Sequence, residues 1–141
     1  MLWRLTAKWG GKTDDTLRLA YTASDAAPPG SPLHSLVAEA HIEHTVFLAM
    51  EGRSDEARWY WQEPRVLSDL RLSAERTRAA AGPFTPRARN VLAYAASRAD
   101  LRDVAHEQFA ALGDVLVEGP YQFNAHPGKL FAADRKKAGV R

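Results

Sequence analysis

The sequence predicts an all-α protein of about seven helices that pair as antiparallel helix hairpins. Apolar residues recur every three or four positions through most of the chain, which is the spacing of one helix face. Cap residues followed by proline begin several segments, and glycine or proline ends them. The one β-like run, at 115–117, has no partner strand, so we expect an extended or loosely helical connection there. Short loops between neighbouring helices favour hairpins.

The composition is that of one globular domain. The chain has 141 residues, of which 45% are apolar and 26% are charged, and no cysteine for a disulfide or a zinc site. It has neither a membrane-spanning apolar run nor a signal peptide in its first residues, so we predict no membrane association and a cytoplasmic location. The net charge is +2, and the spread of arginines along the chain among Asp and Glu disfavours a nucleic-acid partner. We interpret the cluster Arg135, Lys136 and Lys137 as a solvated tail that favours a helix C-terminus.

The first helices are predicted from their caps. Thr13, followed by two aspartates, begins a helix that ends before the breaker at 27–30. Ser31 and Pro32 begin the next helix, and Gly52 ends it. The residues expected on its inward stripe are Leu33, Leu36, Val37, Ala40, His44, Phe47 and Leu48.

The following helices are predicted from similar cap, proline and glycine signals. Ser54 is expected to cap a short helix to about residue 62, and Pro64 to begin a helix that continues to 81. The residues expected to face inward on the second of these are Val66, Leu67, Leu70, Ala74 and Ala81. Thr85 with Pro86 caps the next helix, and Asp100 caps the one that Gly113 ends.

Three regions follow from these elements. We predict an N-terminal arm at 1–12, a helical core at 13–113 and a C-terminal extension at 114–141, all within one domain. Pro127 is expected to open a last short helix that docks through Leu130 and Phe131.

The segment 92–109 resembles a tetratricopeptide repeat (TPR). Leu92 and Ala93 lie on its first predicted helix, and Ala105 and Phe109 lie on its second, so small residues would let the helices approach and the aromatic ring would fill the groove. A weaker copy consists of Leu48, Ala57 and Trp61. Because another predicted helix separates the copies, the resemblance implies TPR-like or α-solenoid-like hairpins rather than a regular array.

A larger part of the chain resembles the C-terminal part of a group of uncharacterised actinobacterial helical proteins. The similar segments are 7–11, 26–33, 40–44, 60–61, 90–91 and 109–113. The group has Pro-Trp where this chain has Pro120 and Tyr121. The resemblance implies a helical fold, assigns no activity, and implies that preceding helices are absent. We therefore expect possible self-association through Leu2, Trp3 and Leu5.

Two sets of residues could form a functional site. His41 and His44 are three residues apart, with Glu43 between them, so both imidazoles lie on one helix face at a spacing that suits metal ligands or a histidine base. The competing interpretation places these histidines in the core, hydrogen-bonded to a carbonyl or a carboxylate. No recognised metalloenzyme motif is present, so we predict neither a metal nor a cofactor.

The second set is aromatic and basic. Trp59, Tyr60 and Trp61 point about 100° apart on a helix, so one ring can lie at a rim while others enter the core. With Arg58 and Arg65 nearby, the tryptophans could line a groove for a peptide or stack on a nucleobase. The competing interpretation makes the aromatic residues filler between helix layers.

The sequence therefore predicts a non-catalytic protein–protein interaction module of TPR-like type, with a protein or peptide partner. The alternative is a small-ligand or metal-binding helical domain, or an enzyme, that uses the face of His41, Glu43 and His44. No catalytic residue is assigned, and catalysis stays an open question that the absence of convergent catalytic residues disfavours.

Overall fold

The computed structural model describes residues 13–117 and 119–141, in which every regular element is a helix and no strand occurs. The all-α prediction is confirmed, with seven α-helices and two short 3₁₀ helices in the described ranges. In chain order they are α2 (Thr13–Ala26), η1 (Pro32–Ser35), α3 (Leu36–Met50), α4 (Ser54–Tyr60), α5 (Pro64–Thr77), α6 (Thr85–Arg98), α7 (Arg102–Leu112), η2 (Pro120–Phe123) and α8 (Pro127–Lys137).

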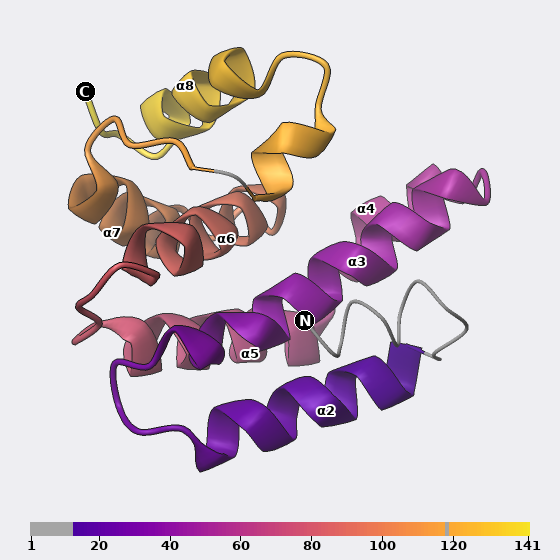
Figure 1. The fold of residues 1–141 in the computed structure, drawn as a ribbon. Coiled ribbons are helices and arrows are strands. Elements are labelled where there is room, and N and C mark those ends of the chain that lie inside the picture. Colours follow the sequence, from indigo (N-terminus) through magenta and orange to yellow (C-terminus); the bar gives the residue numbers. More distant parts are fainter. Residues whose placement is uncertain (1–12, 118) are drawn as a thin grey trace.

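The helices stack in layers around the α6–α7 hairpin. Figure 1 shows α8 on one side of this hairpin, α3 and α5 on the other, and α2 beyond them. Helix α3 is the central element, since it contacts α2, α4, α5 and α6. This position explains why α3 is apolar on nearly every side. The predicted N-terminal arm at 1–12 lies outside the described residues.

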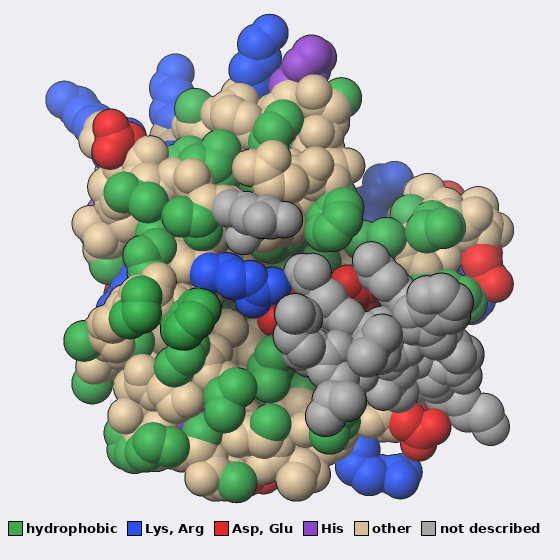
Figure 2. All heavy atoms as spheres, in the orientation of Figure 1, with side chains coloured by type: hydrophobic (Ala, Val, Ile, Leu, Met, Phe, Trp, Pro, Cys, Tyr) green, Lys and Arg blue, Asp and Glu red, His purple; other side chains and the backbone are tan. Residues whose placement is uncertain are grey.

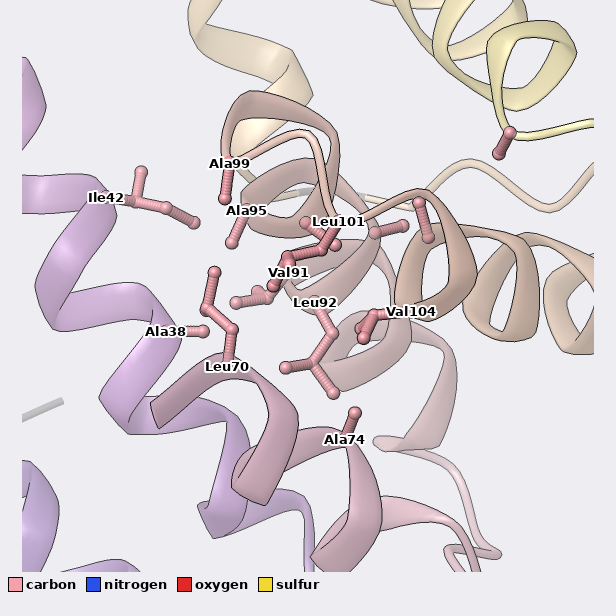
Figure 3. Packing of buried hydrophobic residues seen from close by; sticks show 14 of the residues in the cluster. Ala38, Ile42, Leu70, Ala74, Val91, Leu92, Ala95, Ala99, Leu101 and Val104 are labelled. Carbon is pink, nitrogen blue, oxygen red and sulfur yellow. The ribbon is translucent and has the colours of Figure 1, made fainter. Parts of the chain in front are cut away.

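The surface and the interior differ in the way expected for a globular chain. Figure 2 shows basic side chains projecting from the edge formed by α8, while apolar side chains are scattered over the layers below. Figure 3 shows the main core, where Leu70 from α5 and Ala38 from α3 point toward Val91 and Leu92 on α6. Alanines at 95, 96 and 99 in α6 belong to the same cluster, so neighbouring helices approach closely.

The two helix pairs with the TPR-like pattern do form hairpins. Leu92, Ala93, Ala105 and Phe109 are all buried between α6 and α7. In the α3–α4 hairpin, Leu48 and Trp61 are buried. Helix α5 lies between the two pairs in sequence, as predicted.

The turns between helices confirm some of the predicted helix starts and ends and correct others. Gly52 and Gly113 have positive φ of 76° and 66°, so each ends its helix in the left-handed region that glycine tolerates. Asp100 was predicted as a cap and is not one, because Leu101 occupies the N-cap position of α7. Asp100 instead adopts a positive φ of 57° in the turn before it. Ser31 does cap η1, with its Oγ accepting a hydrogen bond from Leu33 N at 3.2 Å.

Three residues predicted to face inward are exposed. Leu33 lies in the tighter turn of η1, where the α-helical spacing does not apply. Phe47 lies where α3 extends past the body of the molecule, so fewer neighbours cover it (Figure 1). Ala81 follows the end of α5 at Thr77, four residues earlier than predicted.

The C-terminal prediction is confirmed in its main features. Residues 115–117 form neither helix nor strand, and the last helix begins at Pro127. Phe131 and Tyr121 join the main core, with Leu130 packed against it. None of the helices in the described ranges is long and apolar enough to cross a membrane.

We predict that Phe109→Ala lowers the free energy of unfolding by about 3–5 kcal/mol, because it removes a wholly buried ring at the centre of the α6–α7 hairpin. Urea denaturation measures this change. Phe84→Ala is the matched control, since this ring is 67% exposed and its loss should cost less than about 1 kcal/mol. Equal losses in the two variants would contradict the assignment of the core.

Candidate functional site

A chain of buried and half-buried polar side chains joins four helices around His41. His41 on α3 is wholly buried, and its Nε2 lies 2.8 Å from Oδ2 of Asp69 on α5. Its Nδ1 lies 2.6 Å from the hydroxyl of Tyr60 at the end of α4. The hydroxyl of Tyr21 on α2 donates a hydrogen bond to the same oxygen of Asp69. We call Tyr21, Asp69, His41 and Tyr60 the polar relay.

The carboxylate of Asp69 sets the direction of two hydrogen bonds of the polar relay. An ionised Asp69 only accepts, so His41 donates through Nε2–H. The remaining bond, between His41 Nδ1 and the Tyr60 hydroxyl, runs from the hydroxyl when the imidazole is neutral and from the ring when it is protonated. Both ring nitrogens of His41 are therefore occupied, which explains how a histidine is accommodated at a wholly buried position.

Burial and neighbouring charges change the proton affinities around the relay. Burial raises the pKa of the Tyr60 hydroxyl to about 12, although the nearby Arg65 guanidinium opposes this shift. Burial and the hydrogen bond to Asp69 also raise the pKa of Tyr21. The pKa of His44 is lowered by burial first, and then by His41 and Arg53. All three shifts favour the uncharged form, so the relay is a poor site for a stable new charge.

The two predicted histidines are brought together, but not as metal ligands. The rings of His41 and His44 both contact Tyr60, with centroid distances of 5.6 Å and 4.6 Å. No group of three or more His, Cys, Asp or Glu that could hold a metal ion occurs within the described ranges. Glu43, the third member of the predicted set, is half-buried on the same helix.

Three pockets lined by described residues lie away from the relay. One of about 280 Å³ lies between the start of α6 and the end of α7, next to Thr85 and Arg89. The other two lie where α7 and α8 meet, around Arg102 and Ala138. None of these three includes His41 or His44, so none gives the predicted histidine face an access route for a ligand.

The aromatic triplet divides between core and surface, as its 100° spacing requires. Trp59 is 71% exposed, whereas Trp61 is 5% exposed and packs in the main core with Tyr60. Arg58 forms an exposed ion pair with Asp55 at 3.0 Å. Of the residues predicted to bind a partner, Trp59 and Arg58 are therefore accessible, while Trp61 and His41 are not.

Trp59 is one of four exposed large apolar residues on the α3–α4 hairpin. The others lie on the last two turns of α3: Val46, Phe47 and Met50. Phe47 is 51% exposed and Met50 is 82% exposed, and their i, i+3 spacing places them on neighbouring parts of one face. The remaining exposed large apolar residues, Leu19, Leu33, Leu72, Phe84, Val115 and Phe123, lie on six different segments. We call the first set, Val46, Phe47, Met50 and Trp59, the hairpin set.

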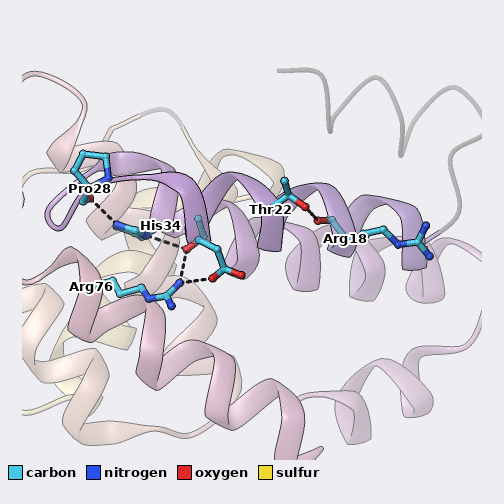
Figure 4. Close-up of polar contacts among 7 residues, drawn as sticks. Arg18, Thr22, Pro28, His34 and Arg76 are labelled. Carbon is cyan, nitrogen blue, oxygen red and sulfur yellow. Dashed lines mark hydrogen bonds and ion pairs between the residues drawn. The ribbon is translucent and has the colours of Figure 1, made fainter.

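Sequence reasoning missed the partners that hold the histidines. Asp69 lies three residues after Val66 and four before Ser73, both buried, so helical spacing could have placed its carboxylate on the inner side of α5. The second buried histidine, His34, bonds to Ser24 Oγ and to the carbonyl of Pro28, each at 2.8 Å. Figure 4 shows Arg76 reaching the same region from α5. These contacts fix the α2–η1 turn.

Comparisons with known proteins add no family to this description. No family model, no curated protein and no solved structure matches the chain. The resemblance to actinobacterial helical proteins therefore stays a prediction.

We predict that Asp69→Asn lowers the free energy of unfolding by about 2–4 kcal/mol, because the buried His41 and the half-buried Tyr21 lose the anionic oxygen that accepts from both. Urea denaturation measures the change. Asp103→Asn makes the same substitution in an exposed ion pair with Arg71, at 2.7 Å, and should cost about 0.5 kcal/mol or less. A larger loss of unfolding free energy for Asp103→Asn than for Asp69→Asn would show that the polar relay does not stabilise the fold.

The raised pKa of Tyr60 predicts a loss of stability at alkaline pH. The pKa is about 12 in the folded state and 10.0 without the fold, so the folded protein retains this proton in the window between them. The contribution is complete below pH 10 and is lost as the pH rises through the folded value. Between pH 10 and about pH 12, this group should lower the free energy of unfolding by about 1.4 kcal/mol per pH unit.

Tyr60→Phe isolates this contribution. Denaturation curves recorded across the alkaline window should show a shallower pH dependence in the variant, whatever its stability at neutral pH. The ultraviolet absorbance of phenolate follows the same ionisation directly. An unchanged slope would mean that Tyr60 does not contribute to the alkaline transition.

Proposed function

We propose that this protein is a non-catalytic interaction module that binds a protein partner through the hairpin set. The observation that supports the proposal is the concentration of Val46, Phe47, Met50 and Trp59 on one projecting hairpin. Met50 lies three residues after Phe47 and four after Val46, so these three side chains adjoin on α3, and large exposed apolar patches are uncommon outside binding sites. Tryptophan and methionine are also enriched at the centres of protein interfaces.

The hairpin presents these residues from a fixed base. Tyr60 and Trp61 follow Trp59 directly and are buried. The ring of Trp59 therefore projects from a segment that is anchored in the core. Gln62 Nε2 donates a hydrogen bond of 3.0 Å to the carbonyl of Ala99, which ties this segment to the end of α6. Little conformational entropy is then lost at the hairpin when a partner binds.

The charges beside the hairpin set indicate an apolar partner surface. Arg53 pairs with Glu51 and Glu56, at 3.3 Å and 2.6 Å, and Arg58 pairs with Asp55. These ions pair within the hairpin and leave a net charge of only −1, two cations against three acids, so the hairpin attracts a charged partner weakly. We therefore expect the apolar face of a partner helix, as in helix-in-groove recognition, rather than a charged peptide.

The finer assignments remain part of this proposal. A TPR-like relation among the hairpins, membership of the actinobacterial helical group and a cytoplasmic location are all compatible with the all-α fold. Self-association through Leu2, Trp3 and Leu5 concerns residues outside the described ranges. The alternative site at His41, Glu43 and His44 has less support, because His41 is buried with both ring nitrogens hydrogen-bonded.

We predict that Trp59→Ala combined with Met50→Ala weakens partner binding by at least about thirtyfold, the effect expected when an interface loses its main apolar contacts. Affinity capture from a native lysate identifies the partner, and titration with the purified partner measures the affinity. Hydrogen exchange of the complex should show protection over 46–60.

Phe84→Ala is the control, because Phe84 is similarly exposed but lies at the start of α6. It should leave the affinity within about twofold of the wild type, as expected for a residue outside the interface. Loss of binding in Phe84→Ala with retention in the Trp59 and Met50 variant would overturn the proposed interface.

A further inference from the structure

The net positive charge of the chain resides in its last 23 residues. Residues 119–141 contain five Lys or Arg and one acid, a net charge of +4, whereas the preceding 118 residues carry a net charge of −2. Arg135, Lys136 and Lys137 lie in the last turn of α8, as predicted for a basic cluster that favours a helix C-terminus. The segment as a whole is folded. It forms η2 and α8, and Tyr121, Phe131 and Ala138 anchor it in the main core.

The single acid of this segment does not offset the surface charge. Asp134 is buried, and its carboxylate accepts hydrogen bonds from the Tyr121 hydroxyl, at 2.9 Å, and from Arg98. The guanidinium carbon of Arg98 in turn lies 5.0 Å from the centroid of the Tyr94 ring. The negative charge is thus compensated inside the protein, and the outer face of α8 carries only cations.

The exposed cations lie along one side of α8. Lys129 and Lys136 are seven residues apart, two turns or about 10 Å along the same face, and neither has an acidic partner among the described residues. The exposed residues between them include Ala132 and Ala133, which would not obstruct a ligand backbone. Lys137 forms an exposed pair with Asp100 at 3.3 Å. Figure 2 shows basic side chains gathered along this edge of the molecule.

The basic surface continues onto α7. Arg102 and Lys137 line the same small pocket, and Arg102 is exposed in the first turn of α7. An aromatic ring lies on the same C-terminal layer, since Phe123 in η2 is 64% exposed although η2 packs against α8. We call Lys129, Lys136, Lys137, Arg102 and Phe123 the C-terminal basic surface.

We propose that the C-terminal basic surface binds single-stranded nucleic acid. Lysines along a helix face complement successive phosphates, and Phe123, exposed on the η2 turn that packs against α8, can stack on an unpaired base. A membrane is a poorer fit, because the apolar face of α8, with Leu130 and Phe131, packs against the core and cannot insert into lipid. This proposal is independent of the hairpin set.

The test uses the full chain and a fluorescein-labelled oligouridylate of about 20 nucleotides, with binding followed by anisotropy. The wild type should bind at about 50 mM salt and lose affinity steeply by about 200 mM. Lys129→Gln with Lys136→Gln should weaken binding about tenfold at the lower salt. Its slope of log affinity against log salt should also be smaller in magnitude by about 1.4, or about 0.7 for each lost phosphate contact.

Arg18→Gln with Arg58→Gln removes the same charge from exposed positions on α2 and α4 and is the matched control. It should change the affinity less than about twofold if the effect is local. Absence of binding at low salt, an unaffected lysine variant, or an equal loss in the control would each overturn the proposal.

Phe123→Ala separates stacking from charge. It should weaken binding about fivefold or more without changing the salt slope, and an abasic strand of the same length should be insensitive to it. An equal effect of Phe123→Ala on the abasic strand would contradict stacking. Tighter binding to phosphatidylserine vesicles than to the oligonucleotide would overturn the proposal in favour of a lipid surface.

The hairpin variants provide an independent check. Trp59→Ala with Met50→Ala should leave oligonucleotide binding unchanged, and the lysine variant should leave capture of the protein partner unchanged. Failure of one proposal is thereby distinguished from failure of the other.

Discussion

One half-buried carboxylate, that of Asp69, lies at the point on which the arrangement of α2 to α5 depends. Asp69 accepts directly from Tyr21 on α2 and His41 on α3, and through His41 it is connected to Tyr60 on α4. Apolar contacts alone permit helices to slide or rotate against one another at small cost. A polar group buried among them permits only arrangements that satisfy its hydrogen bonds. The relay therefore supports a single packing of α2 to α5.

The same principle applies on the other side of the core. Asp134 connects η2, α6 and α8 through Tyr121 and Arg98, while Glu39 on α3 pairs with Arg87 on α6. The carboxylates of Asp69, Asp134 and Glu39 thus each have a cationic or hydrogen-bonding partner on a different helix. The core combines alanines, which let helices approach closely, with large rings such as Phe109 and Tyr121, and these polar links add further specificity to that packing. These polar links lie between two outer surfaces, one on α3–α4 and one on α8. The exposed side chains of those surfaces are not needed for the fold.

Much of the fold could be predicted from local signals. Prolines at 32, 64, 86 and 127 lie in the first turns of helices, and Gly52 and Gly113 end them, because these residues restrict or permit backbone angles regardless of distant contacts. Asp100 misled the prediction because an aspartate suits both a cap and a left-handed turn.

The site was less predictable. The spacing of His41 and His44 correctly places both on one side of α3, yet their partners come from α4 and α5 and depend on how the helices pack. Likewise, sequence spacing separates Trp59 from Trp61 but does not say which of them is buried. That outcome follows from α4 docking against the core through Trp61.

The unequal distribution of charge has a consequence for how the molecule approaches other molecules. A positive C-terminal layer attached to a slightly negative remainder gives the protein a permanent electric dipole moment. In the field of any strongly anionic object, such a molecule rotates before contact, so that α8 faces the anionic object and the remainder of the protein faces away from it. The encounter is then oriented by torque at a distance of about one screening length, roughly 8–10 Å at physiological salt.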